Sequence, residues 1–114
     1  MLSHKNRLIK RGDFEAVYRQ GRPLFCGIIG IKARNNLIGA TRIGVSVGIK
    51  FSKIAVNRNR IKRQIREIFR KNIDSVKKGL DVVVFIKKDG KEKLESGELE
   101  EMIVCALKKG KLIQ

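Results

Sequence analysis

The sequence predicts an α/β domain, because two strand patterns flank a helix pattern and a second amphipathic helix closes the chain. Over Arg42–Lys50, branched residues alternate with small ones, which is the period of a β-strand. An amphipathic helix pattern follows over 58–72, and 81–86 is an unbroken apolar run typical of a strand buried on both faces. This order favours a parallel pair of strands. A chain of 114 residues fits a single domain, 1–114.

The N-terminal part predicts a short helix followed by a strand. Phe14, Val17 and Tyr18 recur at i, i+3 and i+4, which places them on one helix face. Gly21 is placed to end that helix. The next segment, Leu24–Ala33, is apolar and branched, so we expect a strand there.

Turn and cap signals separate the remaining elements. Asn35-Asn36 marks a turn and Lys77–Gly79 marks a loop. Asn57 is the expected N-cap of a helix over Arg58–Asn72. A last helix is expected from about Ser96, and its apolar stripe identifies it as a packing helix: Leu99, Met102, Ile103, Ala106 and Leu107.

The strand pattern at 42–50 has a face of small residues, Gly44, Ser46 and Gly48, opposite its branched residues. Such a face lets another part of a structure approach the backbone closely. A tightly packed helix is the favoured interpretation of this face. A nucleic-acid strand that lies over part of it is the alternative.

Charge is the most distinctive property of the chain. Twenty-seven Lys and Arg residues oppose eleven acidic residues, for a net charge of +16. Residues 1–72 carry +15 of this charge, whereas residues 73–114 are nearly neutral. A cationic surface of this kind attracts a polyanion and releases counterions from each phosphate that it neutralises. A membrane is a poorer fit, because surface binding favours exposed aromatic residues and the chain has five Phe, one Tyr and no Trp.

The sequence shows no targeting, membrane or metal motif. No apolar run approaches the roughly 18 residues that span a membrane. The first ten residues lack the apolar stretch of a signal peptide, so we expect a cytoplasmic protein in which residues 1–10 are mobile. Cys26 and Cys105 fit no metal or redox spacing, and we interpret both as reduced, buried thiols.

The helix pattern at 58–72 combines a packed face with a basic flank. At roughly 100° per residue, four apolar side chains fall in one arc that must face the core: Ile61, Ile65, Ile68 and Phe69. Cations border this arc, with Arg60 further round than Lys62, Arg63, Arg66 and Arg70.

The charge distribution along this helix opposes its own stability. Arg58, Arg60 and Lys62 crowd the N-terminus, where each cation costs roughly 0.3–1 kcal/mol. A phosphate backbone reverses the sign of these terms, because helix N-termini and guanidinium groups both suit phosphate. We therefore interpret the flank as a nucleic-acid-binding surface, and an ordinary solvated basic face is the alternative.

These residues resemble the signature of the bacterial ribonuclease P protein family. The resemblance rests on Arg58-Asn59-Arg60-Ile61-Lys62-Arg63, followed by Arg66-Glu67. Other landmarks follow the family order along nearly the whole chain: Leu8 to Phe14, Arg42 to Val47, and Asp81 to Val84. One departure is that Lys50 to Asn57 is one residue longer than the commonest family spacing, which affects the entry to the helix and the direction of Arg58.

The resemblance implies a fold and an activity. The implied fold is an α/β two-layer sandwich with a mainly four-stranded sheet, similar to the second domain of ribosomal protein S5, with a left-handed strand–helix–strand crossover. The implied activity is that of a subunit of an endoribonuclease that removes the 5′ leader of precursor tRNA. A large catalytic RNA with bound Mg²⁺ performs the hydrolysis. The implied partners are this RNA and precursor tRNA, with no membrane and no required protein partner.

The resemblance also assigns roles to individual residues. Contacts to the catalytic RNA fall to Arg58, Asn59, Arg60, Lys62, Arg63 and Arg66. Phe14 and Tyr18 line a cleft for the leader, with Ser46 nearby. Aromatic rings suit single strands, because stacking is worth ~1–3 kcal/mol per base and tolerates any sequence. No residue of this chain is expected to be catalytic or to ligate a metal, and Mg²⁺ is expected on the RNA and the substrate.

Two other functions remain open on the sequence alone. A ribosomal or ribosome-assembly RNA-binding protein shares the charge and the helix, but does not require Phe14, Tyr18 and the small-residue strand face to converge. A protein-only nuclease needs a carboxylate cluster for metal binding, and the sequence shows none, nor any P-loop, HExxH or zinc spacing. His4, the single histidine, is interpreted as a surface residue.

Overall fold

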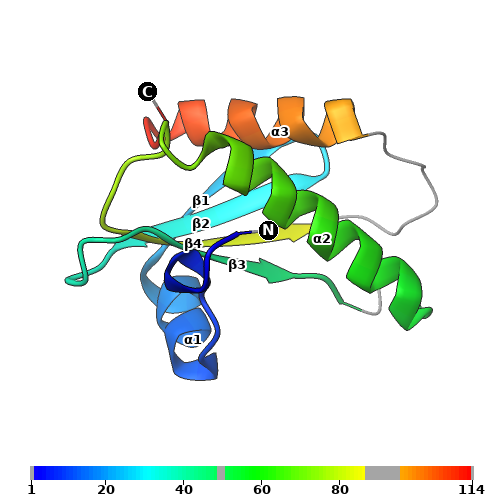
Figure 1. Ribbon diagram of the computed structural model, residues 1–114, viewed down its shortest axis with the longest axis horizontal. Helices are drawn as coiled ribbons and strands as arrows, with labels where there is room; N and C mark the ends of the chain where they lie inside the picture. Colours follow the sequence, from blue (N-terminus) through cyan, green and yellow to red (C-terminus); the bar gives the residue numbers. More distant parts are fainter. Residues whose placement is uncertain (1, 49–50, 87–95, 114) are drawn as a thin grey trace.

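A computed structural model describes residues 2–48, 51–86 and 96–113 of the chain (Figure 1). Within these ranges the elements are η1 His4–Asn6, α1 Arg11–Gln20, β1 Arg22–Cys26, β2 Ile29–Asn35, β3 Arg42–Ser46, α2 Ala55–Asn72, β4 Leu80–Ile86 and α3 Ser96–Lys109. The helices predicted near the N-terminus, before Asn72 and from Ser96 are confirmed, and so is the buried strand at 81–86. Within the described ranges, no helix is both long and apolar enough to cross a membrane.

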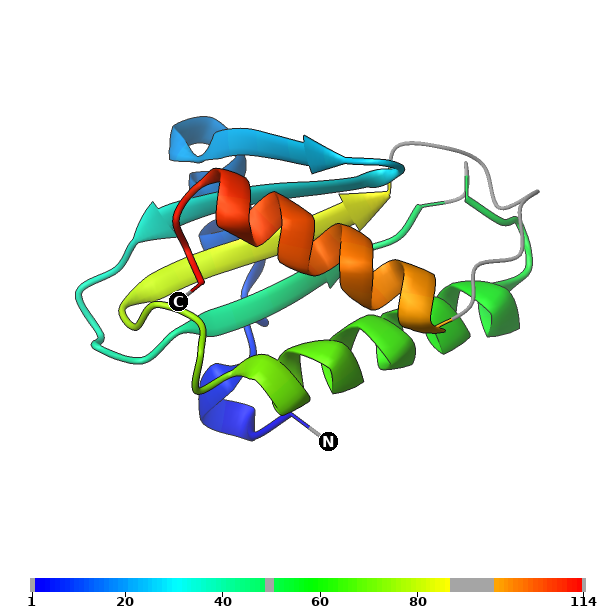
Figure 2. The same ribbon diagram turned by 90° about the horizontal axis from the view of Figure 1, so that it is seen from above.

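The strands form a four-stranded mixed sheet in the order β1-β2-β4-β3. β3 and β4 are parallel, as predicted, and the other two pairs are antiparallel. α2 and α3 cover one face of the sheet, and α1 lies on the other (Figure 1). In Figure 2, β3 and β4 run in the same direction, α2 lies on the near side, and the connection between the strands is left-handed. The α/β sandwich is therefore confirmed.

The larger core lies between the sheet and the helices α2 and α3. The predicted apolar arc of α2 is confirmed, because its members are at most 5% exposed: Ile61, Ile65, Ile68 and Phe69. The stripe of α3 packs beside it through Leu99, Ile103, Ala106 and Leu107, with Met102 partly buried. A smaller cluster, Leu8, Val17, Val83 and the partly buried Phe14, lies under α1 on the opposite face.

The segment before α1 packs against the edge of the sheet at β3. Leu2 and Leu8 are 2% and 4% exposed. Arg7 forms a parallel bridge with Ile43, and the Leu8 N–H donates to the Ile43 carbonyl at 2.9 Å. The sequence pattern indicated a mobile segment over 1–10, whereas two leucines give residues 2–8 apolar anchors in the structure.

The strand predicted over Leu24–Ala33 is wrong as a single element, because the chain folds there into the hairpin β1–β2. Gly27 and Ile28 form the turn, and Gly27 has φ +60°, a conformation that glycine adopts without strain. The turn was missed because Ile28 continues the apolar run across it. Gly21 does end α1, as predicted, but with extended backbone.

The start of α2 also differs from the prediction. The helix begins at Ala55 with Ile54 as N-cap, so Asn57 is not the cap and lies in the first turn. The side chain of Asn57 instead donates to Ser52 Oγ at 3.3 Å, and the Ile54 N–H donates to the same oxygen at 3.1 Å. The preceding strand, predicted over 42–50, ends at Ser46, and residues 49–50 lie outside the described residues.

The two cysteines are paired, so the prediction of two reduced, buried thiols is wrong. Cys26 of β1 and Cys105 of α3 form a disulfide with their Cα atoms 6.1 Å apart, and both residues are half-buried. They are 79 residues apart in sequence. Only the packing of α3 across β1 brings them together, and spacing in the sequence carries no signal of it.

Candidate RNA interface

The N-terminal two thirds of α2 carry five cations and one asparagine, which we call the α2 basic surface: Arg58, Asn59, Arg60, Lys62, Arg63 and Arg66. Asn59, Arg60 and Arg63 are exposed, and the other three are half-buried. Within the described residues, none of its five cations forms an ion pair. The sequence-predicted RNA contacts therefore lie on one helix, with their charges not neutralised by the described carboxylates.

The C-terminal end of the same helix is different. Arg70 Nε donates to Glu67 Oε1 at 2.8 Å, and Lys71 Nζ lies 3.1 Å from Glu100 Oε2 of α3. The charge of Arg70 holds the pKa of Glu67 below its ordinary value, chiefly through this hydrogen bond. Cations near a helix C-terminus are also favoured by the helix dipole. The helix thus divides into an end whose charges are balanced by the protein and an end whose charges are not.

Two members of the α2 basic surface have distinctive surroundings. Arg58 turns back toward the loop before the helix, where its Nη1 donates to the Ser52 carbonyl at 2.9 Å. Burial lowers the pKa of Arg66, and the nearby charge of Arg7 lowers it further. Arg66 therefore lies beside a second cation, an arrangement that an anion between the two would stabilise.

On the opposite face of the sheet, three aromatic rings gather next to α1. The ring centroid of Phe85 lies 6.5 Å from that of Tyr18 and 5.9 Å from that of Phe25. Gly30 lies between Phe25 and Phe85 in the strand register, and a Cβ there would collide with both rings. We call Tyr18, Phe25, Phe85 and Gly30 the aromatic face. Tyr18 is 38% exposed and Phe25 is 39% exposed, so both rings are open to solvent.

A cation lies beside the aromatic face. Lys32 Nζ is 5.4 Å from the centroid of the Tyr18 ring and donates to the Tyr18 carbonyl at 3.3 Å. Rings that stack on bases, with an ammonium group beside them for phosphate, form the usual arrangement for single-stranded nucleic acid.

The three predicted cleft residues have different surroundings. Tyr18 belongs to the aromatic face, and Ser46 pairs with Phe85 in the register of β3 and β4. Phe14 is half-buried, and its ring lies directly over Gly44. At Gly44 the favoured interpretation of the small-residue face, a packed helix, is therefore confirmed, whereas Gly48 has open space on the Cβ side.

Phe25 and Phe85 are the residues of the aromatic face that the sequence analysis missed. Phe85 lies in an apolar strand, where its side-chain direction depends on the register with β2 and β3. Phe25 lies in the segment that was predicted as one long strand. In the strand register Gly30, which has no side chain, lies between Phe25 and Phe85. A correct assignment of the β1–β2 hairpin would have placed Phe25 opposite Gly30 and so indicated an aromatic site.

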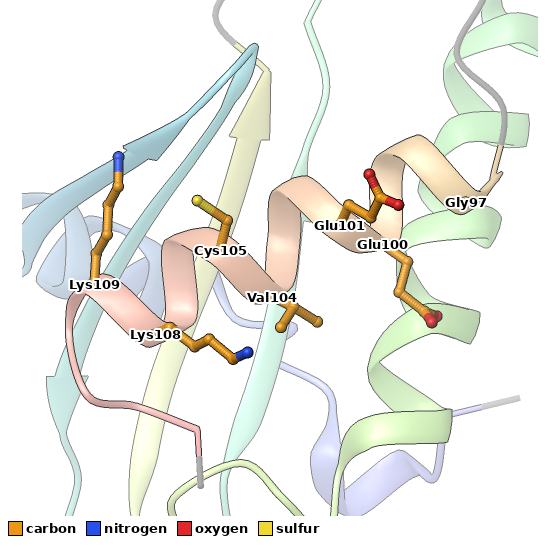
Figure 3. A pocket seen from close by; sticks show the side chains of 7 residues that line it. All are labelled: Gly97, Glu100, Glu101, Val104, Cys105, Lys108 and Lys109. Carbon is orange, nitrogen blue, oxygen red and sulfur yellow. The ribbon is translucent and has the colours of Figure 1, made fainter.

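The described residues hold no metal cluster, and the hollow along α3 lies apart from the predicted site residues. The described residues hold no group of three or more His, Cys, Asp or Glu side chains suited to a metal ion. A hollow follows the outer side of α3, with Glu100 and Glu101 toward one end and Lys108 and Lys109 toward the other (Figure 3). None of the sequence-predicted site residues lines it.

The chain is similar to known proteins in sequence and in fold. The family model described as Ribonuclease P matches residues 2–111. The chain is 42% identical over 87 residues to the ribonuclease P protein component of a Pseudanabaena species, which covers 75% of each chain.

Two solved structures share the fold. The RNase P protein of Staphylococcus aureus superposes with a TM-score of 0.85 at 28% identity, covering 96% of this chain and 98% of that one. The RNase P protein of Thermotoga maritima gives a TM-score of 0.80 at 33% identity, covering 90% of this chain and 96% of that one.

Proposed function

The chain belongs to the ribonuclease P protein family, and from this premise we propose that it binds the catalytic RNA through α2 and the precursor tRNA leader through the aromatic face. Membership makes it a protein component of an endoribonuclease that matures tRNA. In this proposal the RNA performs the cleavage, the protein works in the bacterial cytoplasm, and the RNA and precursor tRNA are its partners.

The observation that carries the RNA-docking role is the absence of ion pairs on the α2 basic surface within the described chain. Arg58 lies in the first turn of α2, where a cation opposes the helix dipole, and the cations at i, i+3 and i, i+4 along the helix repel one another, so both arrangements cost free energy in the isolated protein. Phosphate groups recover that cost, because both the helix terminus and the arginine side chains then face negative charge. The paired cations at the C-terminal end of α2 need no such partner.

The leader-binding role is supported by the exposed rings of Tyr18 and Phe25. Stacking contributes roughly 1–3 kcal/mol per base and does not depend on base identity. A subunit that must accept many different leaders therefore gains affinity without sequence specificity. Lys32 would contact a backbone phosphate next to a base stacked on Tyr18.

Mg²⁺ enters this proposal through the RNA and the substrate. The described residues offer no donor set suited to the ion, and we assign no ligand and no catalytic group to this chain. The protein lowers the Mg²⁺ requirement indirectly, because its cations take over part of the screening of closely packed phosphates.

A reconstitution experiment tests the proposal. Purified protein is added to a bacterial-type ribonuclease P RNA at a Mg²⁺ concentration too low for the RNA to act alone. Cleavage of precursor tRNA at the mature 5′ end, only with both components present, is the expected result. Cleavage by the protein without the RNA would contradict it, and so would a failure to activate the RNA.

A ribosomal or ribosome-assembly role is the alternative. That function requires the α2 basic surface but gives no reason for Tyr18, Phe25 and Phe85 to form an exposed aromatic face. Affinity that depends on the presence of a 5′ leader separates the two functions, because an assembly factor has no use for a tRNA leader.

A further inference from the structure

Asp81 on β4 is a fully buried carboxylate, 0% exposed, at the centre of a polar network. Arg42 binds it in a bidentate manner, with Nε–Oδ1 and Nη2–Oδ2 distances of 2.8 Å each. Arg34 Nη2 lies 3.3 Å from Oδ2, and Asn36 Nδ2 donates to Oδ1 at 2.9 Å. Burial acts to raise the pKa of Asp81, but hydrogen bonds from Arg42 and Asn36 and the charges of both arginines outweigh it and keep that pKa below its ordinary value.

The same two arginines reach both ends of α1. Arg42 Nη1 lies 3.3 Å from Asp13 Oδ2 in the first turn of the helix. Arg34 Nη1 donates at 3.3 Å to Oε1 of Gln20, the last residue of the helix. The register places Arg34, Asp81 and Arg42 in one row across β2, β4 and β3. The Asp81 carboxylate thus holds Arg42 and Arg34 in place, and these two arginines contact the two ends of α1, the helix that carries Tyr18.

The apolar contacts of α1 are few. Its core consists of three buried residues, Leu8, Val17 and Val83, together with the partly buried Phe14. A ten-residue helix has little intrinsic stability and takes its position from the contacts that it makes. The polar ties at its two ends therefore contribute a large part of what fixes its orientation over the sheet.

We propose that Asp81 is a positioning residue that, through Arg42 and Arg34, holds α1 at the orientation that sets the spacing between Tyr18 and Phe85. Asp81 itself is buried beneath the arginines and touches no substrate. The proposal rests on the proposed function only in taking the aromatic face as the leader site.

The first test removes the contact between Arg42 and Asp13 of α1 and leaves Asp81 unchanged. Asp13→Asn removes the charge that Arg42 contacts on α1. Glu15→Gln is the matched control, because it makes the same charge change on the same helix, where Glu15 pairs with Arg11 at 3.1 Å and, among the described residues, with no cation of the sheet. We expect Asp13→Asn to lower the ratio of precursor to mature tRNA affinity by roughly two- to fivefold, the effect of one half-exposed ion pair. Glu15→Gln should leave this ratio unchanged.

The second test needs no RNA. Tyr18 is the single tyrosine and the chain has no tryptophan, so intrinsic fluorescence reports on Tyr18 alone. Loosening α1 should increase quenching of this fluorescence by acrylamide in Asp13→Asn and in Gln20→Ala, but not in Glu15→Gln. If quenching in Asp13→Asn and in Gln20→Ala, the two tie variants, equals that of the wild type, the proposal is overturned.

Asp81→Asn tests the anchor itself and should increase quenching more than either tie variant. Because it leaves two arginines around a neutral group, its folding is checked by circular dichroism, and the tie variants decide the question if it does not fold. Tyr18→Ala separates the two claims. If Tyr18→Ala leaves the precursor-to-mature ratio unchanged, the leader assignment fails, whereas the quenching data still decide the role of Asp81.

Discussion

Tyr18 lies on α1 where the helix meets the sheet, and its neighbours come from two strands, Phe85 from β4 and Lys32 from β2. The i, i+4 spacing correctly places it on the same face as Phe14, toward the sheet. Its contacts with Phe85 and Lys32 depend instead on which strand residues lie under α1. The proposed leader site thus combines one ring from α1, Tyr18, with two rings from the sheet, Phe25 and Phe85.

Replacing Tyr18 tests the leader assignment. Tyr18→Ala removes one stacking surface, so binding of precursor tRNA by the holoenzyme should weaken by about 1–3 kcal/mol, with mature tRNA nearly unaffected. Tyr18→Phe is the control, because it keeps the ring and should retain most of the affinity. Equilibrium binding of both tRNAs measures the difference. Equal losses for precursor and mature tRNA would remove the leader from this face.

Acid unfolding tests the ionised state of Asp81. The pKa of Asp81 is lower in the folded protein than its ordinary value, so at a pH between the folded and the unfolded pKa the folded state binds fewer protons there than the unfolded state. The stabilisation is complete above the unfolded pKa and is lost as the pH falls through the folded pKa. Urea unfolding across this range should show stability falling with acid in the wild type. In Asp81→Asn the fall should be shallower, and an identical slope would show that the carboxylate is not held in the charged form.

At the scale of elements, side-chain periodicity predicted the helix α2 and the strand β4 correctly. The turn between β1 and β2 and the first residue of α2 were not predicted, because they depend on the local backbone conformation. The apolar arc of α2 follows from a period of 3.6 residues, and the buried strand at 81–86 follows from an unbroken apolar run. The β1–β2 hairpin was missed because its turn contains Ile28 and not a polar pair. The N-terminus of α2 was misplaced because the helix begins after Ile54, an apolar N-cap without a side-chain cap hydrogen bond, and the Asn57 side chain donates to Ser52 instead of capping.

Two glycines of the small-residue face give a matched test of how α1 packs. In Gly44→Ala the new Cβ would meet the ring of Phe14, so the ring must move, whereas Gly48 has nothing within 4 Å. We expect Gly44→Ala to lower the free energy of unfolding by about 1–3 kcal/mol. Gly48→Ala should change it by less than about 0.5 kcal/mol. Urea unfolding measures both, and equal effects would contradict the close contact between α1 and β3.

At the scale of the whole molecule, the charge asymmetry predicted from the sequence has a structural counterpart. The N-terminal 72 residues hold nearly all the net charge, and they include the α2 basic surface and α1. The nearly neutral remainder supplies β4 and α3, which complete the sheet and cover the core, and β4 also carries Asp81 and Phe85. Composition thus indicated the partner class.

Other whole-molecule features lie beyond sequence patterns. The left-handed crossover between β3 and β4 runs against the general preference and was available only through the family resemblance. The Cys26–Cys105 disulfide depends on how α3 lies across β1. The polar network around Asp81 joins residues from four elements, β2, β3, β4 and α1. Each of these requires the three-dimensional arrangement, because the partners are distant in sequence.

The central claim is that the unpaired cations of α2 meet RNA phosphates, and the salt dependence of binding to the catalytic RNA tests it most directly. The slope of log affinity against log salt is compared for the wild type, Arg60→Gln and Arg63→Gln. Arg70→Gln is the matched control, because it makes the same change on the same helix where Glu67 already pairs with the cation. The account predicts that the first two variants each reduce the slope by about one counterion, and that Arg70→Gln leaves it close to the wild-type value. Slopes that are unchanged in Arg60→Gln and Arg63→Gln, or reduced equally in all three variants, would contradict it.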